Sequence, residues 1–363
     1  MKKMAAFVGG AVLSASAVAE LPSYSNIYVF GDSLSDNGQF TFGTPPEFQE
    51  TGLKAKATNI DFSSVTNPLD PNPNMVAVEA VARGLGLSLT QSGLVEGLSQ
   101  GQLVDNGNNY AVGGAIALGV EPNPAIGALD TNTPTQIFSH LAYRGNQAES
   151  TALYAYIIGG NDLFAAQGIR AQGVFTEVGE ERQAIRKASK QRVDDAIDAV
   201  RTQLFTLVGS GVQNLLVANA PDISKVPATD ALVAGLLAQI DASVAEAAAA
   251  GIEVSNVNAM QRRAQDMYEN SAALTDRYNR KLANVIDEVE AATGIDIIEW
   301  DLGAFLDNQI DNADELGYTN STDACGGNLN FSPCTGFVFA DAVHPTTAVH
   351  RLAGQEVLEL LAQ

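Results

Sequence analysis

Histidine, cysteine and basic residues are scarce in this sequence. It has 3 His and 2 Cys, and its 20 Lys and Arg stand against 42 Asp and Glu, so the formal charge is −22. A zinc site with four cysteine ligands is excluded, and a metal site built from several histidines is disfavoured. The negative charge repels phosphate backbones and anionic lipids, which argues against nucleic-acid binding and against docking on membranes through basic patches. We therefore expect no metal site and no nucleic-acid partner.

Long hydrophobic runs are also missing beyond the N-terminus. No stretch of residues 20–363 reaches the roughly 20 apolar residues of a membrane helix, so we expect no stable membrane anchor. Hydrophobic residues still make up 46% of the 363 residues, enough to build a core. That length allows one large domain or two ordinary ones. Because no linker or internal repeat divides the chain, we predict a single domain over residues 20–363.

Residues 1–19 have the pattern of a secretory signal peptide. Lys2 and Lys3 precede a short apolar run, and Ala17-Val18-Ala19 is a small-residue cleavage site. We predict cleavage after Ala19 and a secreted or periplasmic protein. The alternative is an uncleaved N-terminal helix.

The two cysteines lie in a loop rich in Gly, Asn, Ser and Pro. Cys325 and Cys334 are nine positions apart and form no CxxC motif. Export would place them in an oxidising compartment, where a disulfide closing this loop is expected. Two free thiols are the alternative.

Strand-like and helix-like segments alternate along the chain. Short β-rich runs ending at glycine or polar turns predict strands, and apolar residues at helical spacing predict helices. The predicted strands cover residues 26–30, 153–158, 212–218 and 295–300, with a strand-like turn before Gly113; the predicted helices cover 74–83, 134–143, 181–208, 229–250 and 257–292, and a last helix follows His344. This alternation predicts an α/β fold, a three-layer α/β/α sandwich in which helices cover both faces of a central parallel sheet.

Small-residue turns with polar groups follow the predicted strands. In open α/β sheets, ligands bind beyond the carboxyl ends of the strands. The turns are Gly31-Asp32-Ser33-Leu34-Ser35-Asp36, Asn109-Tyr110-Ala111-Val112-Gly113-Gly114, Gly159-Gly160-Asn161-Asp162 and, near the C-terminus, Asp341-Ala342-Val343-His344-Pro345. Together they contain a nucleophile, a base, a carboxylate and oxyanion donors, the parts that a serine hydrolase needs.

These four ordered blocks resemble the GDSL, or SGNH, family of esterases and lipases. Asn219-Ala220-Pro221-Asp222, after another predicted strand, also matches the family. The resemblance covers nearly the whole chain and is greatest to secreted bacterial esterases and the passenger domains of autotransporter esterases. It implies a flavodoxin-like sandwich and an ester hydrolase that needs no cofactor.

By this resemblance, Ser33 is the nucleophile, His344 the general base and Asp341 the carboxylate that orients His344. Ser33 lies at a predicted strand-to-helix turn, where its N–H can also donate to an oxyanion. A neutral imidazole can take the serine proton near pH 7, and a carboxylate three residues earlier can reach its Nδ1 across a turn. The structural alternatives are helix-capping roles for Ser33 and Asp341.

The resemblance also implies an oxyanion hole made by the Ser33 N–H, the Gly114 N–H and the Asn161 side-chain amide. Gly113 adjoins Gly114, and the sequence barely separates the two; we prefer Gly114. Asn161 has the alternative of a turn asparagine. Asp32 and Asp36 are better explained as turn-stabilising hydrogen-bond acceptors than as catalysts.

Other residues compete for these roles. Gly97-Leu98-Ser99-Gln100-Gly101 matches the G-x-S-x-G nucleophile elbow, but the elbow requires a strand before it and a helix after it, and neither flank has that pattern. Ser99 is therefore a poor nucleophile candidate. His140 and His350 fall within predicted helices, where we expect surface or packing roles.

A segment of about 45 residues, roughly 228–272, separates the NAPD block from the following helix and strand, which normally come soon after it in this family. Leu232, Leu236, Leu237 and Ile240 recur in it at helical spacing. The segment predicts a helical insertion, either an extra helical pair on the surface or a lid beside an acyl pocket.

The sequence thus favours a secreted hydrolase of carboxylic esters with short to medium acyl chains, acting on a small-molecule or lipid ester. A (lyso)phospholipase or lipid acyltransferase is the enzymatic alternative, because the fold does not select the substrate. A non-catalytic acidic binding protein, dependent on calcium, is the alternative from another class. The oligomeric state does not follow from the sequence.

Overall fold

The computed structural model describes residues 21–38, 75–119, 129–325 and 334–363. The predicted signal peptide and its cleavage after Ala19 lie outside the described residues, so they stay predictions.

Four parallel strands form the central sheet in the order β1-β2-β3-β4. They are β1 (Ile27–Gly31), β2 (Leu153–Ile157), β3 (Asn214–Ala218) and β4 (Ile297–Trp300). Every residue of β1 and β2 is buried, as expected for parallel strands covered on both faces. The four strand predictions are confirmed to within a few residues at their ends.

The segment before Gly113 runs along the free edge of β1. The Tyr110 N–H donates to the Val29 carbonyl (2.8 Å), and the Val112 N–H donates to the Gly31 carbonyl (3.1 Å). With this segment counted, β1 lies between it and β2, which is the flavodoxin-like order. The segment that follows β1 in the chain lies beside one edge of β1, and the next strand, β2, lies beside its other edge. In such folds a crevice opens at the carboxyl end of the strand where the strand order reverses, which here is β1.

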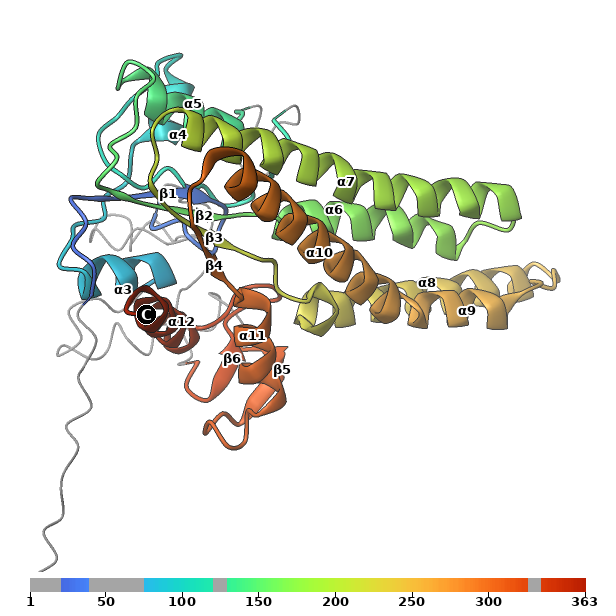
Figure 1. The fold of residues 1–363 in the computed structure, drawn as a ribbon. Coiled ribbons are helices and arrows are strands. Elements are labelled where there is room, and N and C mark those ends of the chain that lie inside the picture. Colours follow the sequence, from blue (N-terminus) through green and yellow to red (C-terminus); the bar gives the residue numbers. More distant parts are fainter. Residues whose placement is uncertain (1–20, 39–74, 120–128, 326–333) are drawn as a thin grey trace, which may run out of the picture.

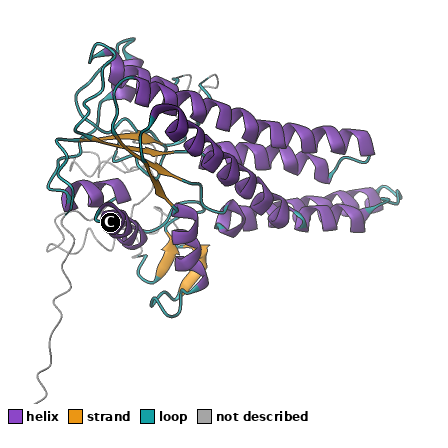
Figure 2. Cartoon of the chain, viewed as in Figure 1, coloured by secondary structure: helices purple, strands orange, loops and turns teal. Residues whose placement is uncertain are grey.

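Helices cover both faces of the sheet, and the three-layer prediction is confirmed (Figures 1 and 2). One face carries α5 (Thr133–Ala142), α6 (Gly160–Ala171), α7 (Gly179–Gly209) and α10 (Met267–Thr293). The other carries α3 (Ala77–Gly84), α11 (Leu302–Asp311) and α12 (Thr347–Leu361). The short helix α4 (Leu94–Ser99) and the 3-10 turns η1 (Gln172–Val174) and η2 (Ile223–Lys225) lie in connections.

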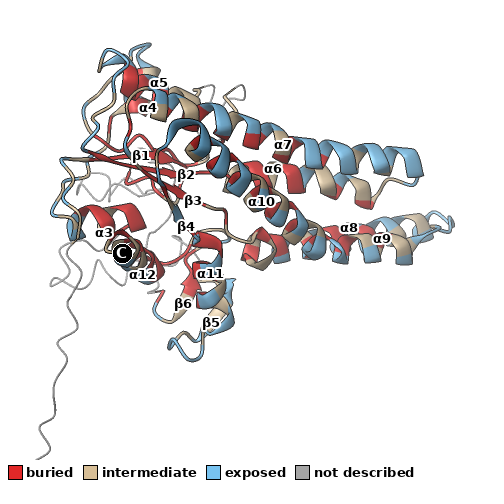
Figure 3. Cartoon of the chain, in the orientation of Figure 1, coloured by how far each residue is buried: buried red, intermediate tan, exposed pale blue. Residues whose placement is uncertain are grey.

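The two sides of each strand supply two separate cores. In β1, Tyr28 and Phe30 pack with the α7 side, whereas Ile27 and Val29 pack with the α12 side. Figure 3 shows this burial concentrated at the sheet and at the helix surfaces that face it. Alternate side chains of the strand are thus buried in different cores, which fixes the register of the strand.

The predicted insertion contains α8 (Pro227–Ala249), α9 (Val257–Gln265) and the start of α10. Val233, Leu236 and Ile240 of α8 pack with Met260 of α9 and with Val174 in a third, smaller core. Figure 1 shows α8 and α9 extending away from the sheet, beyond the ends of the strands. The predicted helix over 257–292 is divided between α9 and α10, because Asp266, between them, has a ψ of −7° that interrupts the helical geometry.

One helix of the described residues, α8, is long and apolar enough by length and composition to cross a membrane, with a mean hydropathy of 1.4 over its most apolar window. Much of this hydropathy comes from alanine, and the helix also packs in the third core. The absence of a stable membrane anchor stays a prediction.

A small two-stranded sheet, β5 (Asn320–Ala324) and β6 (Phe337–Phe339), precedes α12. Cys325 and Cys334 form a disulfide with a Cα–Cα distance of 5.4 Å. The predicted disulfide is therefore confirmed, and it joins the end of β5 to the segment that leads into β6.

Candidate active site

Ser33 lies two residues beyond Gly31, the last residue of β1. Residues 32–36 form one helical turn, closed by the Asp36 N–H donating to the Asp32 carbonyl (3.0 Å). The side-chain amide of Gln136 both donates to the Gly31 carbonyl and accepts from the Gly31 N–H, each at 2.8 Å. The backbone that carries Ser33 is therefore held from the α5 side of the sheet.

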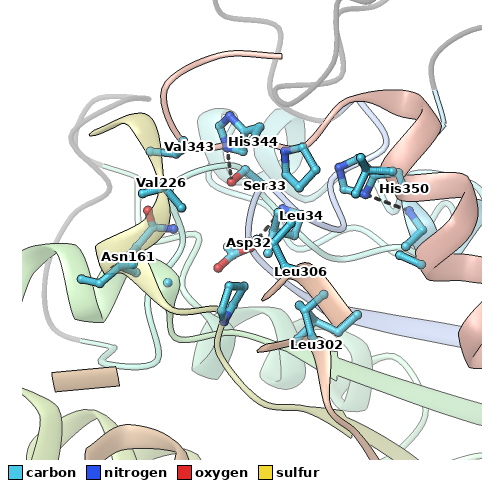
Figure 4. A pocket seen from close by; sticks show the side chains of 18 of the residues that line it. Asp32, Ser33, Leu34, Asn161, Val226, Leu302, Leu306, Val343, His344 and His350 are labelled. Carbon is cyan, nitrogen blue, oxygen red and sulfur yellow. Dashed lines mark hydrogen bonds between the residues drawn. The ribbon is translucent and has the colours of Figure 1, made fainter. Parts of the chain in front are cut away.

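The structure brings Ser33, His344 and Asp341 together. His344 Nε2 lies 2.8 Å from Ser33 Oγ, although the two residues are 311 positions apart. His344 Nδ1 lies 2.7 Å from Asp341 Oδ2. Figure 4 shows the His344 ring directed at the Ser33 hydroxyl. This chain of hydrogen bonds can carry a proton from the hydroxyl to the imidazole and stabilise the imidazolium that results.

Asp341 is held by its own loop as well as by His344. Its Oδ1 accepts hydrogen bonds from the N–H groups of Val343 and His344, both at 2.8 Å. Burial opposes ionisation of this carboxyl, but the charge of His344 and the hydrogen bonds outweigh it, so the pKa of Asp341 lies below its ordinary value. The carboxylate is thus the form that faces the imidazole.

The loop that carries His344 is tied at both ends. The Ala340 N–H donates to the His344 carbonyl (2.9 Å), and the Thr346 N–H donates to the Val338 carbonyl (2.8 Å). The Ala228 N–H, in the first turn of α8, donates to the Ala342 carbonyl (2.8 Å). The start of the insertion therefore supports this loop, using an N–H that a helix leaves without an internal partner.

The structure separates Gly113 from Gly114. The Gly113 N–H donates to the Asp36 carboxylate at 2.8 Å. Gly114 has a φ of +80°, and among the described residues neither its N–H nor that of Ser33 has an acceptor. The Gly114 N–H is thus the better placed of the two to serve a ligand, which agrees with the preference from the sequence.

Asn161 lies in the first turn of α6 and lines the same cavity as Ser33 (Figure 4). Its Nδ2 donates to the Ala115 carbonyl at 2.8 Å, which fixes the amide and leaves a second N–H on the same nitrogen. The preceding Gly159 has a φ of +125°, and a Cβ there would lie 2.4 Å from the Tyr278 ring. Only glycine therefore fits at position 159, where the chain passes the Tyr278 ring just before α6 begins.

A cavity of about 290 Å³ opens beside these groups. Its polar end contains Ser33, Asn161, His344 and Gly114. The rest of its lining is mostly apolar and comes from both faces of the sheet: Phe164, Ile223, Val226, Trp300, Leu302, Phe305, Leu306, Val349 and Ala353. No lining residue among the described ones lies within 228–272, so α8 beyond its first residue and α9 do not border this cavity.

Asp32 is a buried carboxyl next to the candidate nucleophile. Its Oδ1 accepts the Leu34 N–H at 3.0 Å, so it stabilises the turn as the sequence suggested. Burial raises the pKa of Asp32 to about 7, and the nearby Asp162 charge adds to this, while hydrogen bonding and His344 oppose it. Ionisation of this group therefore costs the folded state free energy.

We expect Asp32→Asn to change how stability depends on pH. Because the folded pKa of Asp32 is raised, its protonated carboxyl does not reduce the free energy of unfolding below the unfolded pKa, near 4. As the pH rises toward 7, the free energy of unfolding of the wild type falls. The loss is at most about 4 kcal/mol at 1.36 kcal/mol per pKa unit. Asparagine keeps an acceptor for the Leu34 N–H but cannot ionise. Urea unfolding should show the variant becoming the more stable protein between pH 4 and pH 8.

Asp241→Asn, at an exposed carboxylate of α8, is the matched control for this series. It should follow the wild-type pH dependence throughout. Parallel stability curves for the wild type and Asp32→Asn would show that Asp32 ionises without cost.

The competing candidates are placed elsewhere. Ser99 is the last residue of α4, so the residues before it are helical and the strand required by a nucleophile elbow is missing. His140 is buried among the rings of Tyr28 and Tyr110, and burial lowers its pKa to about 3. His350 lines the cavity, but its Nδ1 accepts the Ala77 N–H at 3.3 Å. Both histidines pack within the protein, as the sequence suggested.

Several residues that hold the backbone around the candidate site were not predicted from the sequence. Gln136 clamps Gly31, as described above, and Asp162 Oδ2 accepts the Ala117 N–H at 2.8 Å. The Tyr278 hydroxyl donates to the Ile158 carbonyl at 3.0 Å, just before the Gly159 turn. In the sequence, such a residue can be recognised only as a polar side chain among the apolar positions of a predicted helix. The group to which it hydrogen-bonds depends on the tertiary fold. Within the described ranges, no cluster of three or more His, Cys, Asp or Glu side chains could hold a metal ion.

The family model of GDSL-like lipases and acylhydrolases matches residues 27–357, which span all four blocks. The chain belongs to this family. It is 26% identical over 411 residues to Lipase 1 of Photorhabdus luminescens, covering 99% of this chain and 54% of the relative. It is 37% identical over 99 residues to Acetylajmalan esterase 2 of Rauvolfia serpentina, covering 26% of this chain and 25% of the relative. This GDSL-family chain thus spans about half the length of the first relative and matches a quarter of the second.

Solved structures of hydrolases are similar to this GDSL-family chain over most of its length. An acetyl xylan esterase from Geobacillus stearothermophilus has 12% identity and a TM-score of 0.37, covering 93% of this chain and 95% of the other. Phospholipase A1 from Streptomyces albidoflavus has 12% identity and a TM-score of 0.35, covering 93% and 98%. These values say nothing about the substrate of this chain.

Proposed function

We propose that this protein is a secreted serine hydrolase that cleaves carboxylic esters with short to medium acyl chains through an acyl-enzyme. The observation that carries the proposal is the hydrogen-bonded chain from Ser33 Oγ through His344 to Asp341, at 2.8 and 2.7 Å, which opens into an apolar cavity. Family membership supports it independently.

In the proposed reaction, Ser33 Oγ attacks the ester carbonyl carbon while His344 Nε2 takes the hydroxyl proton. The carbonyl oxygen becomes an oxyanion, which accepts hydrogen bonds from the Ser33 N–H, the Gly114 N–H and the Asn161 amide. The carbon–oxygen bond to the alcohol breaks, and the leaving alkoxide takes the proton back from His344. Water then repeats the same steps on the acyl-enzyme and releases the carboxylic acid.

The cavity supports the choice of acyl group. Its lining beyond the polar end is mostly apolar, which suits a hydrocarbon chain, and its volume of about 290 Å³ lies at the lower end for small-molecule sites. Figure 4 places Leu302 at the far side of the cavity from His344. An acyl chain of short to medium length would extend from Ser33 toward that residue.

A fluorophosphonate that reacts with activated serines tests the proposal directly. We expect stoichiometric labelling of the purified protein, with peptide mass spectrometry locating the adduct on Ser33, and hydrolysis of p-nitrophenyl esters blocked in proportion. Hydrolysis of phospholipid, or acyl transfer to an added alcohol in preference to water, would instead favour the phospholipase or acyltransferase alternative. Failure of the folded protein to react would favour the non-catalytic alternative.

Leu302→Phe should shorten the acyl chain that the protein prefers. A larger side chain at the far side of the cavity removes space that only longer chains occupy, and each excluded methylene is worth about 1–3 kcal/mol. We expect kcat/KM for p-nitrophenyl octanoate to fall about tenfold or more relative to the acetate, measured on the same preparation. The acetate rate is the internal control. An unchanged ratio would show that acyl chains do not reach Leu302.

A further inference from the structure

A second, small cleft lies at the other end of α6 from Asn161. It is lined by residues of α6, η1, α7, α9 and α10, and four arginines are among them: Arg170, Arg182, Arg186 and Arg263. Asp266 is the carboxylate in the lining. In a chain with 20 basic and 42 acidic residues, this excess of positive charge in one cleft runs against the composition of the whole protein.

Three of these guanidinium groups are held by neutral oxygens. Arg170 donates through Nε and Nη2 to Asn270 Oδ1 (3.0 and 2.6 Å), and Arg263 Nε donates to the Val174 carbonyl (2.9 Å). Arg182 Nη1 donates to the Thr176 carbonyl at 3.0 Å. These contacts orient the side chains without neutralising them, and most of the five N–H donors of each guanidinium stay available.

The four arginines differ from others in the protein. Arg201 and Arg277 form ion pairs with Glu288 and Asp194, and those hydrogen bonds raise their pKa values. None of the cleft arginines has a carboxylate within ion-pair distance among the described residues.

The cleft arginines also act on one another. Burial lowers the pKa of Arg170, and the charge of Arg186 lowers it further, although Asp266 opposes this. Burial and then the charge of Arg182 lower the pKa of Arg263, opposed by Glu177. At Arg170 and Arg263 the charge of the neighbouring arginine has a larger effect than that of the carboxylate, and an added anion would relieve this repulsion.

We propose that this cleft binds a tetrahedral oxyanion of the phosphate class. Guanidinium forks match the oxygens of phosphate in paired hydrogen bonds. The cleft is small, about 30 Å³, so it has room for the ligand oxygens that contact the guanidinium groups and leaves the rest of the ligand in solvent. Arg170 lies nine residues along α6 from Asn161, about 14 Å at 1.5 Å per residue, so binding here is separate from the ester site.

Calorimetric titration with inorganic phosphate at low salt tests this site. The wild type should bind one phosphate saturably. Arg186→Gln removes an exposed guanidinium that has no described hydrogen-bond partner, so the fold should be unaffected and affinity should fall about tenfold, the equivalent of one charge-assisted hydrogen bond. Arg170→Gln combined with Arg263→Gln should abolish binding.

Arg201→Gln is the matched control, because it makes the same charge change on α7, fifteen residues from Arg186, and should bind as the wild type does. Thermal melting checks that each variant is folded. The absence of saturable binding by the wild type, or equal weakening by Arg186→Gln and Arg201→Gln, would overturn the site. The readout is independent of Ser33, so it stands apart from the proposed ester hydrolysis.

Sedimentation with vesicles of phosphatidylglycerol and phosphatidylcholine identifies the source of the phosphate group. Vesicle binding by the wild type but not by Arg186→Gln would identify a lipid headgroup as the ligand. Phosphate binding without vesicle binding would identify a soluble oxyanion, the result that the negative charge of the whole molecule favours.

Discussion

Ser33→Ala is expected to lower kcat for p-nitrophenyl ester hydrolysis by about 10⁴- to 10⁶-fold, the range for loss of the nucleophile in serine hydrolases. The substitution removes Oγ, the atom that lies 2.8 Å from His344 Nε2, and leaves the Ser33 and Gly114 N–H groups in place. Any residual rate would come from the oxyanion donors and from binding alone. KM should change little, because the apolar cavity is untouched.

Ser99→Ala is the matched control for this experiment, since Ser99 stands in the other sequence motif that could hold a nucleophile. Its hydroxyl donates to the Glu96 carbonyl at 2.7 Å on the surface of α4. We expect full activity from this variant. A loss of activity in Ser99→Ala, together with its retention in Ser33→Ala, would transfer the nucleophile role and contradict the proposed function.

Asp341→Asn is expected to lower kcat by about 10⁴-fold while the protein stays folded. An asparagine oxygen can still accept the N–H groups of Val343 and His344 that now reach Oδ1 at 2.8 Å. Its amide nitrogen would then face His344 Nδ1 and donate to it, so the ring would carry its proton on Nε2. That tautomer cannot accept the Ser33 proton, and no carboxylate would stabilise the imidazolium.

The measurements are steady-state kinetics across pH and thermal melting of the same samples. Asp323→Asn, at an exposed aspartate of β5, is the control and should match the wild type. If Asp341→Asn lost activity only in proportion to a lower melting temperature, Asp341 would support the loop and nothing more. Wild-type activity in a folded Asp341→Asn protein would remove Asp341 from the mechanism.

The fold could be predicted in outline because its elements are encoded locally. The strands β1 to β4 are short apolar runs that end at glycine or polar turns, and α7 and α10 have long helical periodicity. α6 escaped prediction because it begins in the Gly160-Asn161-Asp162 turn and contains Gly168, which together hide its start and weaken its helical pattern. The strand expected before Gly113 forms only isolated parallel bridges, from Asn109 to Val29 of β1 and to Gln91.

The candidate site, like the fold, could be predicted from the sequence only in part. Ser33, Asn161 and the Asp341–His344 block could be found from the sequence because each lies in a short motif after a strand or before a helix. The choice between Gly113 and Gly114 could not be resolved there. It depends on Asp36, which accepts the Gly113 N–H across 77 positions of the chain.

The sequence by itself determined the family, the alternation of strands and helices, the cysteine pair and the residues that can form the site. These follow from local patterns and short motifs, which folding does not alter. Only the tertiary structure decided that Ser33 and His344 meet, that residues of both sheet faces enclose an apolar cavity, and that arginines from three helices share one cleft. Such contacts depend on the strand order and on how helices pack, and these are set by burial over the whole chain rather than by any segment of it.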